Sequence, residues 1–83
     1  MRVTVLYFAA ARERAGTDRE ALELPEGATA GQAKAGAIAA HPQLAPLAPQ
    51  LRIAVDRAFA DDAQPLRADC EVALIPPVSG GRN

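Results

Sequence analysis

One stretch of the sequence, Ala30 to Ala40, is typical of an α-helix, and a single clear helix in a short chain narrows the folds available to it. Thr29 precedes this stretch and predicts an N-cap, because its hydroxyl can accept a hydrogen bond from an early helical N–H. Ala33 and Ala37 lie four residues apart on one face of the helix. Pro42 ends the pattern, because the residue before a proline avoids the α region.

Two strand patterns precede this helix and three follow it. Val3–Phe8 is rich in β-branched and aromatic residues and carries apolar residues on both faces, which predicts an interior strand. Glu20–Leu24 alternates and predicts its hairpin partner. The later strands are expected at Leu51–Val55, Ala58–Ala60 and Glu71–Ile75. The order ββαβββ predicts an α+β fold of the β-grasp (ubiquitin-like) type, a mixed sheet packed on one main helix.

The connecting segments carry turn and breaker residues. Ala9–Arg14 predicts a short helical turn, and Gln43–Gln50, which holds two prolines, predicts a loop or short turns. Pro76-Pro77 cannot donate ladder hydrogen bonds and should end the sheet. We therefore predict a domain over residues 1–75 and a flexible tail over residues 76–83.

Charge and composition exclude several classes of function. Nine basic and ten acidic residues give a net charge of -1, and no basic stripe is visible, which argues against a nucleic-acid partner. No apolar run approaches the roughly 20 residues that span a bilayer. The N-terminal residues are typical of a strand and lack the features of a secretion signal. We therefore expect a cytoplasmic protein with no membrane partner.

Cys70 and His41 are the chain's one cysteine and one histidine. One thiol cannot form an internal disulfide, and the chain shows neither a metal-ligand pair nor a Cys/His catalytic set. We expect Cys70 to be a passive thiol, because no basic neighbour is evident to lower its pKa. We expect His41 to have a capping role at the C-terminus of the helix.

The C-terminal run combines a double proline, a spacer and a double glycine. Together with other segments, it resembles the small, sulfur-carrying subunits of molybdopterin synthases (MoaD type) over essentially the whole chain. The segments that carry the resemblance are Val5–Ala9, Arg12-Glu13, Gly16, Leu24–Thr29, Pro65-Leu66, Glu71–Leu74 and Leu74–Gly81. A bare Gly-Gly is weak evidence, whereas this pattern after a β-grasp strand order is specific.

The resemblance implies a mechanism centred on Gly80 and Gly81. An activating enzyme adenylates the Gly81 carboxylate with ATP, and a sulfur donor protein converts it to a thiocarboxylate. The tail then enters the large subunit of a heterotetramer, where sulfur passes to a pyranopterin precursor. The acyl-adenylate and the thiocarboxylate are transient covalent forms, no cofactor is bound, and the chain alone is not an enzyme.

We hypothesise that Phe8, Phe59 and Ile75 belong to a surface that docks a partner. If the helix covers the Val/Leu face, alternation points Phe8 and Ile75 outward, and an exposed apolar patch marks an interface. The alternative is that they are ordinary core residues beneath a loop. The resemblance implies that Arg12 pairs with acidic groups on partners, and the alternative there is a solvated surface arginine. The expected partner-binding residues are Phe8, Arg12, Phe59, Ile75, Pro76, Pro77, Val78 and Ser79.

Arg82-Asn83 departs from the family pattern, which normally ends at Gly-Gly. With these residues present, Gly81 has no free carboxylate to activate. There are three explanations for these two residues: a protease removes them, they are an artificial extension, or this copy of the protein cannot take up sulfur. We hypothesise that removal or extension explains them better than loss of function.

Three other functions remain open at this stage. The same tail chemistry would serve a sulfur carrier for thiamin, cysteine or tRNA thiolation. A ubiquitin-like modifier would be joined to lysines through Gly81. A β-grasp interaction module would use no tail chemistry, so that loss of Gly80 and Gly81 would change nothing.

Overall fold

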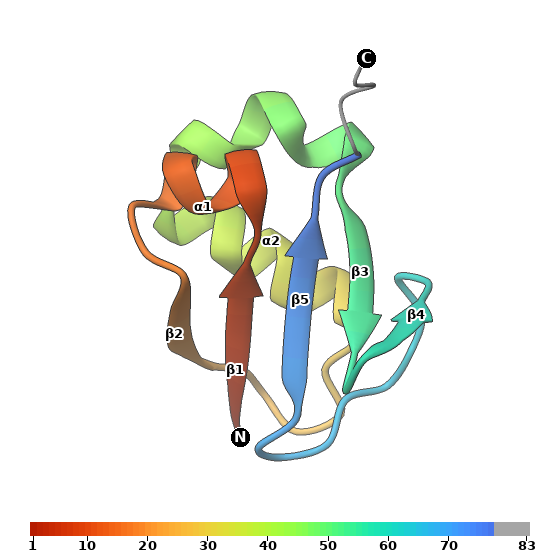
Figure 1. The fold of residues 1–83 in the computed structure, drawn as a ribbon. Coiled ribbons are helices and arrows are strands. Elements are labelled where there is room, and N and C mark those ends of the chain that lie inside the picture. Colours follow the sequence, from red (N-terminus) through yellow and green to blue (C-terminus); the bar gives the residue numbers. More distant parts are fainter. Residues whose placement is uncertain (78–83) are drawn as a thin grey trace.

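Five strands form one mixed sheet in the order β2-β1-β5-β3-β4 (Figure 1). The structure is a computed structural model that describes residues 1–77. The β1 and β5 strands pair in parallel, and the other neighbours are antiparallel. The predicted mixed sheet, with β1 in its interior, is confirmed. The strands are β1 (Arg2–Tyr7), β2 (Arg19–Glu23), β3 (Arg52–Val55), β4 (Ala58–Ala60) and β5 (Glu71–Ile75).

Helix α2 (Ala30–Ala40) packs on one face of this sheet (Figure 1). Its inward positions are alanines, so the helix lies close to the strands. Gly36 also faces the sheet, because a Cβ built there would lie only 3.1 Å from a Leu22 methyl carbon. Burial of this apolar surface is the main stabilising term in such a domain. The fully buried core residues include Val3, Val5, Ala30, Ala33, Ala37, Leu44, Val72 and Leu74.

The predicted ends of α2 are confirmed. The Thr29 hydroxyl accepts a hydrogen bond from the Gln32 N–H, and the Gln32 side chain accepts one from the Thr29 N–H at 2.8 Å. This reciprocal pair satisfies two N–H groups that a helix start otherwise leaves free. At the other end, the His41 N–H donates to the Ala37 carbonyl at 2.9 Å, and Pro42 follows.

Two further helical segments are longer or more regular than the sequence predicted. Helix α1 (Ala9–Ala15) extends the expected turn and ends at Gly16, whose φ of 77° is left-handed. The segment Pro42–Gln50 is a 3₁₀ helix, η1, so a loop over Gln43–Gln50 is wrong, and the short turns that were the alternative join into one regular helix. Its prolines donate no hydrogen bond but still accept, and the fully buried Leu44 anchors the segment to the core.

Candidate functional site

The tail leaves the sheet at the end of β5, beside β1 and β3. In register, Ile75 lies opposite Arg52, and the Phe8 N–H donates to the Leu74 carbonyl at 3.4 Å. Pro76 is buried and Pro77 is exposed. The predicted site residues Val78, Ser79, Gly80 and Gly81, together with Arg82-Asn83, lie outside the described residues. The structure therefore places the root of the tail.

A groove crosses the sheet face that points away from α2. One row of paired residues runs through all five strands: Arg19, Leu6, Ala73, Ala54 and Phe59. The two alanines in the middle are small and the residues outside them are large, so the row is hollowed at its centre. The hollow has a volume of about 350 Å³.

Phe8, Phe59 and Ile75 all line this groove. Phe8 is 46% exposed and Phe59 is 62% exposed, while Ile75 is half-buried. The prediction that Phe8 points outward is therefore confirmed, and the alternative of a loop-covered core residue is wrong for the two phenylalanines. Exposed aromatic side chains around a hollow of this size are typical of a surface that meets a partner.

Arg12 is exposed on α1 and does not line the groove. Its backbone N–H donates to the Phe8 carbonyl at 3.3 Å, so it lies one helical turn from the groove's rim. The structure therefore brings Phe8, Phe59 and Ile75 together and leaves Arg12 at the margin of this surface.

Three arginines belong to this face and were missed by sequence reasoning. Arg19 and Arg57 line the groove, and the Arg52 guanidinium lies 4.0 Å from the centre of the Phe59 ring. Arg52 could have been identified from the sequence, because it alternates with Ile53, which is buried. Arg19 and Arg57 carry no such signal, because the place of Arg19 depends on strand order and that of Arg57 on the geometry of a tight turn.

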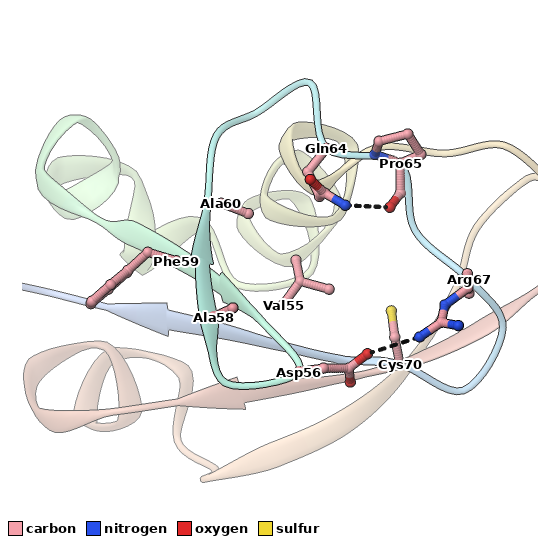
Figure 2. A pocket seen from close by; sticks show the side chains of 9 residues that line it. All are labelled: Val55, Asp56, Ala58, Phe59, Ala60, Gln64, Pro65, Arg67 and Cys70. Carbon is pink, nitrogen blue, oxygen red and sulfur yellow. Dashed lines mark hydrogen bonds and ion pairs between the residues drawn. The ribbon is translucent and has the colours of Figure 1, made fainter.

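A second hollow, of about 330 Å³, lies between β4 and the segment before β5 (Figure 2). Cys70 lines it and is 5% exposed. Burial raises the pKa of the Cys70 thiol, and the nearby Asp56 charge also raises it. Arg67 pairs with Asp56 at 3.8 Å at the mouth of the hollow. A protonated thiol is a poor nucleophile, which fits the expectation of a passive Cys70.

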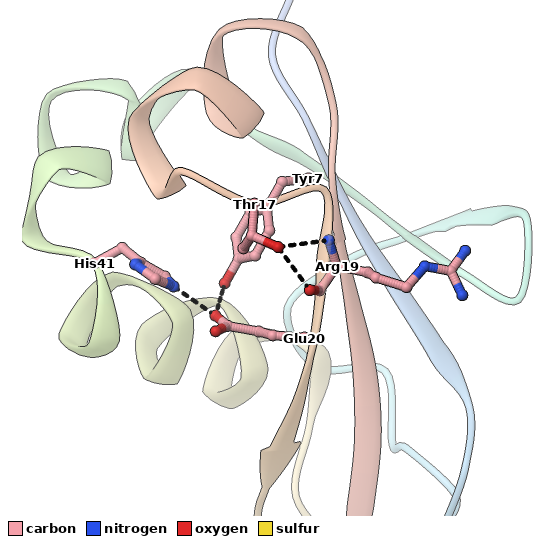
Figure 3. Close-up of polar contacts among 5 residues, drawn as sticks. All are labelled: Tyr7, Thr17, Arg19, Glu20 and His41. Carbon is pink, nitrogen blue, oxygen red and sulfur yellow. Dashed lines mark hydrogen bonds and ion pairs between the residues drawn. The ribbon is translucent and has the colours of Figure 1, made fainter.

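A polar cluster closes one side of the core (Figure 3). The Tyr7 hydroxyl donates to Glu20 at 2.5 Å, and the His41 Nε2 lies 2.6 Å from the same carboxylate oxygen. His41 is the C-cap residue of α2, as predicted, but it caps through its backbone N–H, and its imidazole contacts Glu20. The cluster links β1 and β2 to the end of α2, and Figure 3 shows Arg19 extending away from it.

Tyr7 gives this cluster a testable pH dependence. Burial raises the pKa of Tyr7, and the hydrogen bond and charge of Glu20 raise it further from the ordinary value of 10.0. Folding therefore favours the neutral phenol, and this contribution is complete below the unfolded-state pKa and is lost as pH rises above it. We expect the free energy of unfolding to fall above pH 10 by up to about 1.4 kcal/mol per pH unit.

The measurement is urea unfolding of the wild type and of Tyr7→Phe at about pH 8 and about pH 11. Tyr7→Phe should cost about 1 kcal/mol at the lower pH, because a hydrogen bond is lost. Its stability should fall less steeply between the two pH values. Cys70 titrates with the same sign in both proteins and therefore cancels. Parallel losses in the two proteins would contradict the assignment to Tyr7.

Two features are absent from the part of the chain that the structure describes. None of the helices over residues 1–77 is long and apolar enough to cross a membrane. No group of three or more His, Cys, Asp or Glu side chains within the same residues is placed to hold a metal ion.

Comparison with known proteins defines the family. The sequence pattern of the ThiS family matches residues 5–81. A molybdopterin synthase sulfur carrier subunit from Chlamydomonas reinhardtii is 40% identical over 83 residues, covering 98% of this chain and 100% of the relative. The resemblance to these subunits is therefore confirmed.

Solved structures show the same architecture. SAMP1 from Haloferax volcanii matches with a TM-score of 0.89 at 27% identity, covering 98% of this chain and 100% of that one. A chain in the complex of subunits 1 and 2 of the molybdopterin-converting factor from Helicobacter pylori 26695 matches with a TM-score of 0.72 at 21% identity, covering 98% and 100%. The predicted β-grasp fold is confirmed, and the match across residues 5–81 shows that the chain belongs to the ThiS family.

Proposed function

We propose that this chain is the sulfur carrier subunit of a molybdopterin synthase, with Gly81 as the residue that carries sulfur. The observation that supports this most directly is the extent of the family match, which runs from β1 through Gly81. The near full-length relative that is named as such a subunit supports the same assignment. In this proposal, Arg82 and Asn83 are removed before the protein works.

The proposed chemistry takes place on the tail, in the active sites of partners. The Gly81 carboxylate attacks ATP, forms an acyl-adenylate and releases pyrophosphate. A sulfur donor protein then delivers sulfur at the oxidation level of sulfide, a carbon–sulfur bond forms as the bond to AMP breaks, and a thiocarboxylate remains. Two glycines without Cβ atoms allow this end to enter a narrow channel. The thiocarboxylate then transfers its sulfur to a pyranopterin precursor, and the Gly81 carbonyl carbon gains an oxygen from water and returns to a carboxylate.

The body of the domain has a docking role in this proposal. Ile75 is both the last residue of β5 and part of the groove, so a partner seated on the groove meets the root of the tail. The candidate nucleophile Cys70 is buried, and His41 is held against Glu20. These features favour a subunit that supplies a group for transfer and leaves acid–base catalysis to its partner.

The proposed partners are a large subunit, an adenylating enzyme and a sulfur donor protein, in the cytoplasm. Two copies of the large subunit and two copies of this chain would form a heterotetramer. The similar Helicobacter pylori chain belongs to a protein–protein complex of subunits 1 and 2 of the molybdopterin-converting factor, which supports a partner of this kind. The last proposed partner is a protease that removes Arg82-Asn83.

A modifier function is the second candidate, because one of the similar structures is SAMP1, a small archaeal modifier protein. The same acyl-adenylate would then react with a lysine amine of a target and release AMP, leaving an isopeptide bond. The product separates the two functions: a carrier yields a free thiocarboxylate, and a modifier yields a joined protein.

The test is the intact mass of the chain ending at Gly81 after incubation with activating enzyme, ATP and a sulfur donor. We expect one oxygen to be replaced by one sulfur, and the product to convert a pyranopterin precursor when the large subunit is added. Isopeptide-linked species in place of the thiocarboxylate would favour the modifier. No mass change, with an enzyme active on another carrier, would contradict both.

A further inference from the structure

The groove face carries positive charge that the chain as a whole does not have. Arg19 and Arg57 line the groove, Arg52 stacks on Phe59, and Glu71 is the one acidic residue in the lining. The complete chain has a net charge of -1. The ion pairs found within residues 1–77 all involve groups other than these three arginines. Their guanidinium groups are therefore available to a partner.

Arg57 occupies a strained backbone position that its own domain does not explain. In the β3–β4 turn, Asp56 has a φ of 49° and Arg57 a φ of 74°. Two left-handed residues are typical of a type I′ turn, whose second position favours glycine. Asp56 serves the fold, because its carboxylate accepts the Glu71 N–H at 2.9 Å and its own N–H donates to the Glu71 carbonyl.

No comparable bond is made by the Arg57 side chain with any residue in the described range 1–77. Arg57 thus places a bulky cation at a position where glycine would relieve backbone strain, and its side chain lines the groove. Strained positions that lack an internal reason are frequently functional. The side chain is therefore best explained by a contact outside the domain.

Arg52 contributes a second kind of contact. Its guanidinium is held 4.0 Å from the Phe59 ring centre, and it stands opposite Ile75 at the root of the tail. When a partner covers Phe59, water leaves this pair and the cation–π attraction becomes stronger. The guanidinium can still donate to a carboxylate along its edge, because ring stacking uses only its flat face.

The three arginines stand on different sides of the groove. Arg19 lies on the β2 edge, Arg52 at the tail end of β3, and Arg57 in the turn at the other end of β3. The floor between them is formed by Ala54 and Ala73. An apolar side chain fits the floor, and carboxylates around it would meet the arginines.

We propose that this groove selects a protein surface that presents an apolar side chain surrounded by carboxylates, and that Arg57 and Arg52 bind those carboxylates. The occupant is the docking surface of the large subunit. The inference therefore rests on the proposed function and specifies the chemistry of its partner. It predicts binding that weakens with salt, because charges at the rim of an interface are screened.

The decisive variant is Arg57→Gly, measured for stability and for affinity to the large subunit. Relief of strain should raise the melting temperature by about 4 °C. Affinity should fall about tenfold at low salt and converge with that of the wild type at high salt. A variant that is more stable yet binds less tightly separates a contact with the partner from damage to the fold.

Arg67→Ala is the matched control, because Arg67 is also an exposed arginine but lies outside the groove. Its affinity should equal that of the wild type. Arg52→Lys tests the second contact, and about a fivefold loss is expected, because lysine keeps the charge but loses the flat fork.

The outcomes separate this inference from the proposed function. If the wild type binds the large subunit and Arg57→Gly binds equally well at low salt, the proposal that the arginines bind carboxylates of the partner is overturned and the carrier function stands. If the wild type does not bind, both are overturned. Arginine-dependent binding to phosphatidylglycerol vesicles, without binding to the large subunit, would instead assign the face to an anionic membrane and overturn the proposal.

Discussion

A chain that ends at Gly81 takes up sulfur on its terminal carboxylate, and a chain shortened by that one residue takes up none. We expect this result when both are incubated with the activating enzyme, ATP and a sulfur donor. The carboxylate of the shortened chain belongs to Gly80 and lies up to about 3.5 Å short of the reacting position, and a misplacement of about 1 Å can already cost about 100-fold in rate. Intact mass measures the outcome directly.

The chain that ends at Asn83 is the informative comparison. Its terminal carboxylate belongs to a bulkier residue two positions beyond Gly81, and a channel shaped for glycine excludes side chains at its narrow part. We expect no thiocarboxylate on this form until Arg82 and Asn83 are removed. Sulfur carried on Asn83 in the untrimmed chain would contradict the assignment of Gly81.

Phe8→Lys should abolish binding to the large subunit while the domain remains folded. Phe8 is 46% exposed on the rim of the groove, and its fold contacts are backbone hydrogen bonds that lysine also makes. A lysine ammonium placed against an apolar surface must lose water without gaining a partner. We expect the dissociation constant to rise by more than about 100-fold, as for the loss of an aromatic residue that dominates an interface.

Ala40→Lys provides a matched control, because it adds the same charge at an exposed position at the end of α2, away from the groove. Titration calorimetry should give wild-type affinity for this variant. The far-ultraviolet circular dichroism and urea midpoint of Phe8→Lys establish that it is folded. A folded Phe8→Lys protein with unchanged affinity would remove Phe8 from the site.

In the proposed function, the groove serves recognition of the partner and the tail carries the chemistry. The groove would place the body against the partner, and Ile75, the last residue of β5, joins that surface to the tail. A rigid body that docks in one orientation reduces the space the tail must search, which raises its effective concentration in the partner's site. Docking variants should therefore slow transfer without changing the thiocarboxylate itself.

The local elements were predictable because their signals are local. The Thr29 cap, the stop at Pro42 and the apolar character of both faces of β1 each depend on residues close in sequence. The segment Pro42–Gln50 was mispredicted because proline is normally taken as a breaker. Pro42 stands at the start of this 3₁₀ helix, where an N–H would have no partner within the segment, and the buried Leu44 supplies the stabilisation that propensity does not.

The polar cluster was missed because its members are far apart in the sequence, whereas Arg19 and Arg57 were missed because no motif marks their place on the groove. Glu20 meets Tyr7 across 13 positions and His41 across 21. Arg57 reaches the groove through a strained turn, where pattern reasoning would favour glycine. Each of these contacts is created by strand order and turn geometry rather than by a motif.

The resemblance to a family, rather than any local pattern, pointed to Gly80-Gly81 as the proposed reactive end. Local patterns in the chain were enough to identify the strands and the main helix. These properties follow from side-chain periodicity, caps and breakers, which act over a few residues. The parallel pairing of β5 with β1, and its antiparallel pairing with β3, became known only from the folded chain. That pairing places Phe8 and Phe59 around the Ala54 and Ala73 floor, beside the root of the tail. The physical reason is that a strand's alternation specifies its faces, whereas its neighbours are chosen by burial across the whole core.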